Sequence, residues 1–198
     1  MRGTEISARR RELHDSDSKG DFAMREFSFD FVEERIRKKT FGVLTTIDRQ
    51  ERPHSTGVLY GISPPESKFS IYVMASAGYA KVRNAKHNPN VSLVVTFPHY
   101  YLRFVPASYV MFRGKAEVVP PDDTDGRWAF NQKRILRMSQ SVDAAREPVF
   151  IRLDPEPTVF CYGVGIGAIQ LRRHIESGAY KVIIPEGRLA SKKSHQNL

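Results

Sequence analysis

Short runs of β-branched and apolar residues, separated by polar loops, constrain the fold of this chain more than any other feature. They occupy residues 41–47, 54–60, 69–74, 90–96 and 108–119. Runs of this kind are typical of strands, and the short connections between most of them favour antiparallel neighbours. Residues 149–153 and 158–162 are typical of a last strand pair or of one bent strand. The sequence therefore predicts a mostly β domain built as a small closed or split barrel.

Three stretches with helical character interrupt the strands. The first should begin at Asp30, because Asp is a good N-cap and Glu33 stands at the capping-box spacing. The second covers about residues 79–86 and ends before the Pro89 turn. The third follows the acidic residues 122–125 and should form one helix of about 15 residues. Residues 97–108 match no element, and Gly114 is a candidate β-bulge.

The two ends of the chain differ from its middle. Residues 1–24 are polar and lack periodicity, which predicts a disordered or weakly ordered leader. Residues 186–198 have the same character and predict a flexible basic tail. Residues 25–185 are therefore expected to form one folded domain.

Charge and cysteine content narrow the class of protein. The chain carries 31 Lys and Arg against 22 Asp and Glu, a net charge of +9 that favours anionic ligands. The surplus is spread along the chain, so we expect no specific nucleic-acid partner. The single cysteine, Cys161, excludes an internal disulfide and any multi-cysteine metal site, and no metal-binding histidine cluster is present. With no apolar secretory segment and no membrane-spanning run, we expect a cytoplasmic protein.

The segment from Ala75 to Asn84 has the strongest chemical signal. A strand is expected to end there in a turn of small residues, followed by a helix with Lys81 near its first turn. Helix N-termini present free N–H groups and the positive end of a dipole, and Ser76 and Lys81 would add a hydroxyl and an ammonium donor. From local physics alone, a phosphate site and an ordinary turn with a solvated lysine both remain open.

The stretch from Phe41 to Val118 resembles the pyridoxamine 5'-phosphate oxidase-like, FMN-binding split-barrel superfamily. The resemblance rests on residues 41–48, 52–59, 76–84, 87–95 and 110–118, above all on Lys81 placed eight residues before Pro89. It implies a mostly β (α+β) fold: a six-stranded antiparallel split β-barrel with peripheral helices. It also implies a homodimer with its cofactor sites at the subunit interface.

The resemblance further implies a set of cofactor-binding residues. Ser76 and Lys81 would hold the phosphate of the cofactor, and Ala75 would lie close to it. Thr56, Gly57 and Val58 would line the isoalloxazine ring with backbone groups. His54 and Ser55, which precede them on the same strand, complete the set. Arg83 and Asn84 follow the lysine on the same helix and are weaker candidates for contacts. No catalytic side chain and no metal ligand can be assigned.

Three departures from the pyridoxamine phosphate oxidases themselves change the expected function. Those enzymes have arginines at the positions of Thr56 and Ala80 and a lysine at that of Gly61, and their C-terminal substrate motif is missing here. Oxidation of vitamin B6 is therefore not expected. A subgroup that uses the deazaflavin coenzyme shares the Ala-Lys-Xaa-Arg-Asn pattern of residues 80–84.

The resemblance therefore predicts a flavin-dependent oxidoreductase that transfers a hydride to or from a small organic substrate. FMN is the expected cofactor, with the 8-hydroxy-5-deazaflavin coenzyme F-420 as the alternative. A non-catalytic flavin- or haem-binding module on the same fold is a further alternative.

Overall fold

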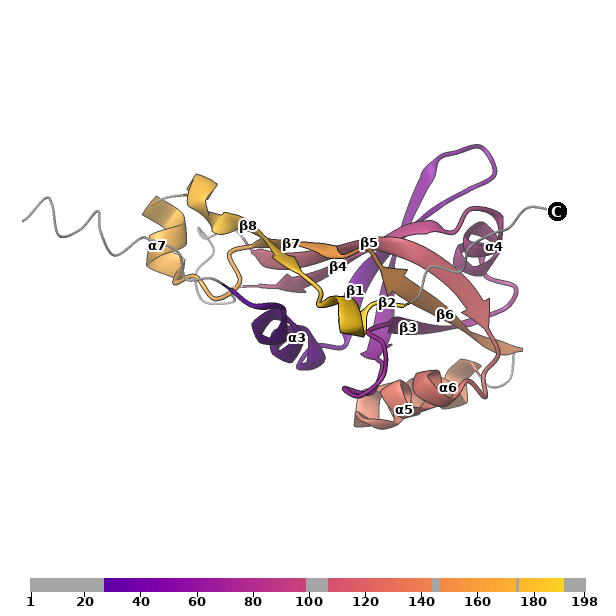
Figure 1. Ribbon diagram of the computed structural model, residues 1–198. Coiled ribbons are helices and arrows are strands. Elements are labelled where there is room, and N and C mark those ends of the chain that lie inside the picture. The colour runs from indigo at the N-terminus through magenta and orange to yellow at the C-terminus, as the bar shows by residue number, and fades with distance from the viewer. Residues whose placement is uncertain (1–26, 99–106, 144–146, 174, 191–198) are drawn as a thin grey trace, which may run out of the picture.

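The computed structural model describes residues 27–98, 107–143, 147–173 and 175–190. Its strands are β1 (Phe41–Ile47), β2 (Pro53–Ile62), β3 (Ile71–Ser76), β4 (Asn90–Phe97), β5 (Ser108–Val119), β6 (Pro148–Pro155), β7 (Thr158–Tyr162) and β8 (Ala179–Ile183). They form one sheet in the order β4-β1-β2-β3-β6-β5-β7-β8, and an additional β4–β5 pairing closes it (Figure 1). Six strands thus form a closed antiparallel barrel, and β7 and β8 extend beyond it. The predicted fold class is confirmed.

Strand β5 is where the barrel divides. One edge pairs with β4 from Ser108 to Lys115, while the other pairs with β7 from Tyr109 to Met111 and with β6 from Gly114 to Val119. The expected last strand pair is wrong, because β6 and β7 are not neighbours but both pair with β5. Gly114 is not a bulge either. A Cβ there would lie 2.3 Å from the Asp154 carbonyl oxygen, so glycine permits the close approach of β6.

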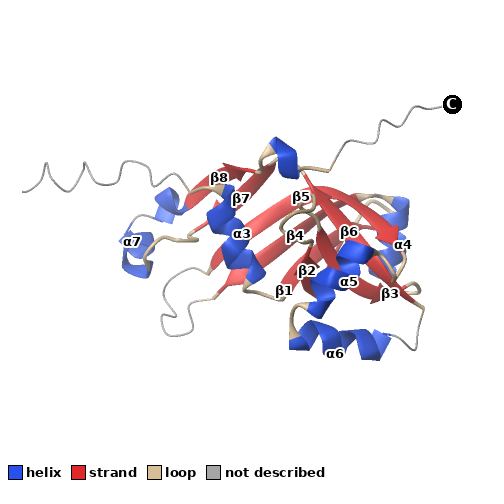
Figure 2. Cartoon of the chain, turned by 60° about the horizontal axis from the view of Figure 1, so that its bottom comes forward, coloured by secondary structure: helices blue, strands red, loops and turns tan. Residues whose placement is uncertain are grey.

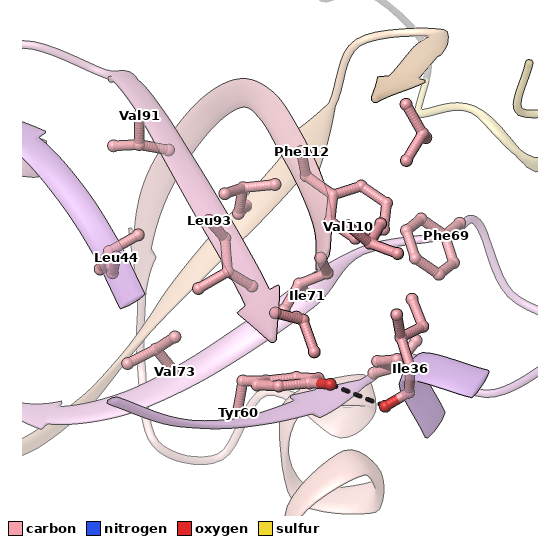
Figure 3. Packing of buried hydrophobic residues seen from close by; sticks show 14 of the residues in the cluster. Ile36, Leu44, Tyr60, Phe69, Ile71, Val73, Val91, Leu93, Val110 and Phe112 are labelled. Atoms are coloured by element: carbon pink, nitrogen blue, oxygen red, sulfur yellow. Dashed lines mark hydrogen bonds between the residues drawn. The ribbon is translucent and has the colours of Figure 1, made fainter. Parts of the chain in front are cut away.

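Alternate residues of each barrel strand point inward and form the main core. Leu44, Ile71, Leu93, Val110 and Phe112 are among its most buried members (Figure 3). The buried Tyr60 hydroxyl donates a hydrogen bond of 2.7 Å to the Ile36 carbonyl oxygen, which satisfies a group at the C-terminal end of a helix. Burial raises the pKa of Tyr60 well above its ordinary value.

Helix α3 (Phe29–Arg37) packs its apolar face against the barrel (Figure 2). Its N-cap is Ser28, whose hydroxyl oxygen accepts a 3.3 Å hydrogen bond from the Phe31 N–H. The expected cap at Asp30 is therefore wrong. With the helix beginning at Phe29, that side chain is 4% exposed and joins Val32 and Ile36 on the buried face.

A second core cluster lies beneath α5 (Thr124–Asn131) and α6 (Arg134–Asp143). The single helix expected here is instead two helices that meet at residues 132–133 (Figure 2). The break lets Phe130 and Leu136 both reach this cluster, where each is at most 1% exposed. The Asp123 side chain accepts a hydrogen bond from the Gly126 N–H and caps α5, as residues 122–125 predict.

The described chain after β7 contains elements that the sequence patterns did not predict. These are α7 (Ala168–Arg173), a 3-10 helix (Ile175–Gly178), β8 and a second 3-10 helix (Glu186–Arg188). The chain turns before them, with positive φ at Gly163 and Gly165. Arg188 reaches back to Glu33 on α3 at 2.9 Å.

The predicted leader at 1–24, most of the unassigned stretch 97–108, and residues 191–198 lie outside the described residues. In the described part of the chain, no helix has the length and hydropathy needed to cross a membrane.

Candidate functional site

The first half of β2 carries a strand on only one of its edges within the described part of the chain. β1 pairs with β2 over residues 53–59, whereas β3 pairs with it only over residues 60–62. The Tyr60 N–H donates to the Thr40 carbonyl on the β1 side. Because these groups alternate along an antiparallel strand, the other edge receives the N–H and C=O groups of Ser55 and Gly57. That edge offers backbone donors and acceptors to a polar, planar ligand.

The five predicted residues of β2 therefore differ in what they present. Ser55 and Gly57 are exposed and direct their backbone groups to the open edge. Val58 is 5% exposed, packs in the barrel core and directs its backbone groups to β1, so it does not face that edge. By the same alternation His54 and Thr56 bond β1 through their backbones and lie on the same face of the strand as Val58, His54 exposed and Thr56 partly buried.

Thr56 has an unusual hydroxyl. Its Oγ1 is buried and has no hydrogen-bond partner within the described residues. Such groups are rare in folded proteins, and each implies an unseen partner such as water or a ligand. Thr56 thus fits a position that contacts a bound molecule. A cofactor that hydrogen-bonds to its hydroxyl would be compatible with the residues present here.

The end of β3 supplies the second group of predicted residues. Ala75 has no exposed surface and packs in the core, so it can meet a ligand only through its backbone. Ser76 is 6% exposed and lies on the opposite face of the strand, opposite Pro148 of β6. The chain then turns, with the Tyr79 N–H donating to the Ser76 carbonyl at 3.0 Å.

Helix α4 (Ala80–His87) begins directly after this turn. Its N-cap, Tyr79, makes no side-chain capping hydrogen bond, so no side chain of the cap residue satisfies the first N–H groups. Lys81 is partly buried in the first turn, with its Nζ 5.1 Å from the centroid of the exposed Tyr79 ring. An ammonium group and the positive end of the helix dipole therefore occur together here.

Arg83 and Asn84 make contacts that shape the site. The exposed Arg83 folds its guanidinium back onto the Gly78 carbonyl oxygen and closes the turn. Asn84 is 9% exposed and donates from Nδ2 to Thr46 Oγ1 of β1 at 3.1 Å. The side chain of Asn84 thus holds α4 against the barrel.

The contact of Asn84 with Thr46 also links α4, by way of β1, to the start of β2. Thr46 Oγ1 in turn donates to the His54 carbonyl oxygen at 3.3 Å, so Asn84, Thr46 and His54 link α4 to the start of β2. The structure therefore places the first turn of α4, the end of β3 and the open half of β2 on one side of the barrel. No trio of His, Cys, Asp or Glu side chains gathers as metal ligands in the ranges described.

The residue patterns missed a cavity of about 200 Å³ at the other end of β2. It shares no residue with the predicted cofactor set. Its basic residues, Arg37, Lys39 and Lys133, come from segments far apart in the chain, which explains why no local motif reveals it.

A six-stranded antiparallel barrel with a lysine-bearing helix beside an open strand edge defines a split-barrel protein. The family model of pyridoxamine 5'-phosphate oxidase matches residues 29–160, about two thirds of the chain. The chain therefore belongs to the pyridoxamine 5'-phosphate oxidase family. No curated protein matches it at a significant level.

Several solved structures share the fold. HutZ, a heme storage protein from Vibrio cholerae, matches with a TM-score of 0.56 at 20% identity over 69% of this chain and 96% of its own. A heme binding protein from Mycobacterium smegmatis gives a TM-score of 0.58 at 17% identity over 71% of this chain and 56% of its own. An FAD-binding protein from Mesorhizobium loti gives 0.50 at 19% identity over 67% and 90%. Because none of these structures is more than 20% identical to the chain, the likeness establishes the fold alone.

Proposed function

We propose that this chain is a flavin-dependent oxidoreductase that binds FMN by its phosphate at Ser76 and Lys81. The observation that carries the proposal is the start of α4. A helix start whose N-cap side chain makes no capping bond, a partly buried lysine and the buried end of β3 occur together beside the open edge of β2. Phosphate suits such a position because backbone N–H groups and an ammonium both donate to its oxygens.

The remaining contacts would come from β2. The open-edge groups of Ser55 and Gly57 can pair with the polar edge of the flavin ring, and the Thr56 hydroxyl would gain the partner it lacks. A bound flavin supplies hydride transfer by its own chemistry. The residues of this chain would hold it, orient it and limit its contact with water.

A homodimer belongs to the same proposal. The outer faces of β1, β4 and β5 present a row of apolar side chains, with Val43 paired to Val94 and Val94 to Met111. Phe41 next to this row is 54% exposed. A second copy that covers this face would bury apolar surface and bring further residues to the cofactor.

Two alternatives have specific support. The deazaflavin coenzyme F-420 could be held by the same phosphate contacts, because the chain has Ala80 and not an arginine before Lys81. A haem-binding module is supported by the fold shared with two proteins described as binding or storing heme.

The absorption spectrum and mass spectrum of the molecule that copurifies with the protein distinguish these cases. The proposal predicts flavin absorbance and the mass of FMN, followed by bleaching of the flavin when a reduced nicotinamide is added. The mass of the deazaflavin or a haem Soret band would support the corresponding alternative. A protein that binds none of these on reconstitution would contradict the proposal.

A further inference from the structure

A cavity of about 200 Å³ lies between the C-terminal end of α3, the second half of β2 and the junction of α5 with α6. Figure 2 shows α5 and α6 side by side on this side of the barrel. Its walls are formed by the basic residues Arg37, Lys39 and Lys133 and by residues of β2, α5 and α6, among them Tyr60, Trp128 and Leu136.

The geometry of the cavity depends on a close contact of α5 with β2. A Cβ at Gly61 would lie 2.9 Å from backbone atoms of Ala129, so only glycine lets the helix approach this far. The break between α5 and α6 follows one turn later and carries Lys133 into the wall. The cavity is therefore a product of the fold and not of a surface loop.

Positive charge gathers at one side of the cavity. Arg37, Lys39 and Lys133 all line it, and no lining residue is acidic. The Lys133 ammonium donates to the Lys39 carbonyl oxygen at 2.6 Å, which uses one of its three protons. Burial, and next the charges of Arg37 and Lys39, lower the pKa of Lys133. These three cations therefore lie near one another.

Glu33 is the acidic partner of Arg37, and it does not neutralise the charges of Lys39 and Lys133. Glu33 accepts hydrogen bonds from Arg37 at 2.6 Å and from Arg188 at 2.9 Å. One carboxylate thus serves two guanidinium groups, and within the described residues neither Lys39 nor Lys133 forms an ion pair with a carboxylate. The Lys39 ammonium lies 5.5 Å from the centroid of the Phe97 ring, a contact that leaves its charge in place. An anion in the cavity would relieve the repulsion and supply acceptors to the remaining ammonium protons.

The rest of the cavity is apolar. Tyr60, Ile62 and Leu136 are at most 5% exposed and form its floor, with the Trp128 ring at the wall. A cavity of about 150 Å³ accommodates benzene, so this volume is suited to one ring or a short chain with an anionic head. An inorganic anion would leave the apolar floor without a partner.

We propose that this cavity is a binding site for a small organic anion, of the aromatic or short-chain carboxylate class. The carboxylate would lie against Lys133 and Lys39, and the apolar body against Trp128 and Leu136. This site is separate from the phosphate position at Ser76 and Lys81, and it stands whether or not the chain binds a flavin.

Trp128 provides a direct test because it is the single tryptophan of the chain. The purified full-length protein is titrated with benzoate, with benzyl alcohol as the uncharged analogue and with inorganic phosphate, and Trp128 fluorescence is recorded. We expect a saturable change with benzoate at least tenfold tighter than with benzyl alcohol or phosphate. No saturable change with benzoate would overturn the proposal, as would an equal response to benzyl alcohol. Tighter binding of phosphate would overturn the carboxylate assignment.

Two variants assign the charge contacts. Lys133→Met should weaken benzoate about tenfold or more, the loss expected for one charged hydrogen bond. Lys39→Met removes a charge while the Lys39 backbone carbonyl still accepts from Lys133, so it tests the same site with less risk to folding. Arg134→Met, at an exposed neighbouring position, is the matched control and should leave affinity unchanged. Unchanged affinity in both lysine variants would overturn the proposal, and their flavin absorbance reports separately on the proposed function.

Discussion

Cys161 is inert in the folded protein because of where β7 places it. It is 3% exposed, and burial raises the pKa of its thiol to about 12, with a hydrogen bond to Tyr180 opposing the shift. A thiol reagent at neutral pH should therefore label the native protein very slowly and the denatured protein completely. Labelling of the native protein within the mixing time would show that this environment is wrong.

The raised pKa of the Cys161 thiol also makes the stability of the fold depend on pH in the alkaline range. In the unfolded chain the thiol loses its proton near its ordinary pKa of about 9, whereas the folded chain holds it to about 12. The unfolded state therefore binds fewer protons in this window, and the free energy of unfolding should fall as pH rises through it. Tyr60, Tyr72 and Tyr180, whose pKa values are also raised by burial, act in the same direction. Denaturant titrations at a series of pH values measure the fall.

Single residues also show how far the sequence could predict the site. Ser76 and Lys81 could be proposed because a strand end, a turn and a helix start follow one another directly in the chain. The role of Asn84 could not, because its partner Thr46 is 38 residues away in the sequence. The cluster of cationic side chains at the cavity could not be predicted for the same reason, since Lys39 and Lys133 are separated by 94 residues.

Among the elements, the close pairing of β5 with the end of β6 depends on Gly114. A Cβ there would meet the Asp154 carbonyl oxygen at 2.3 Å, and backbone cannot move aside as a side chain can. Gly114→Ala should therefore lower the free energy of unfolding by about 3 kcal/mol. Gly78→Ala is the control, because a Cβ at Gly78 has no atom within 4 Å. Thermal denaturation gives the melting temperatures of both variants. Equal values would contradict a close approach of the β5 and β6 backbones at Gly114.

Strands were easier to predict than helix boundaries or late elements. Strand β1 was predicted to the residue, as was β5, because β-branched runs between polar loops leave few alternatives. The pairing of β7 with β5 was not visible, because it depends on how the barrel divides. Strand β8 has only five residues at the edge of the sheet, and its burial alternates weakly, so its pattern is faint.

At the scale of the whole molecule, the proposed dimer predicts that a charge on the outer face of the barrel separates the subunits. Val94→Glu would place a carboxylate between Val43 and Met111, which a partner subunit would have to desolvate. Light scattering after size-exclusion chromatography should report a dimer for the parent chain and a monomer for the variant. Ile135→Glu, on a side chain of α6 that is 52% exposed, should leave the dimer intact. A monomeric parent chain, or a dimer that Val94→Glu leaves intact, would contradict the proposed interface.

The central claim is that a cofactor phosphate is held at the start of α4. The most direct measurement compares the affinities of the apoprotein for FMN and for riboflavin, which lacks the phosphate, in the parent chain, in Lys81→Ala and in Lys86→Ala. FMN should bind about 10- to 100-fold more tightly than riboflavin to the parent chain and to Lys86→Ala, an exposed position on the same helix. Lys81→Ala should bring the two affinities closer together. Riboflavin binding as tightly as FMN, or an FMN preference unchanged in Lys81→Ala, would contradict the claim.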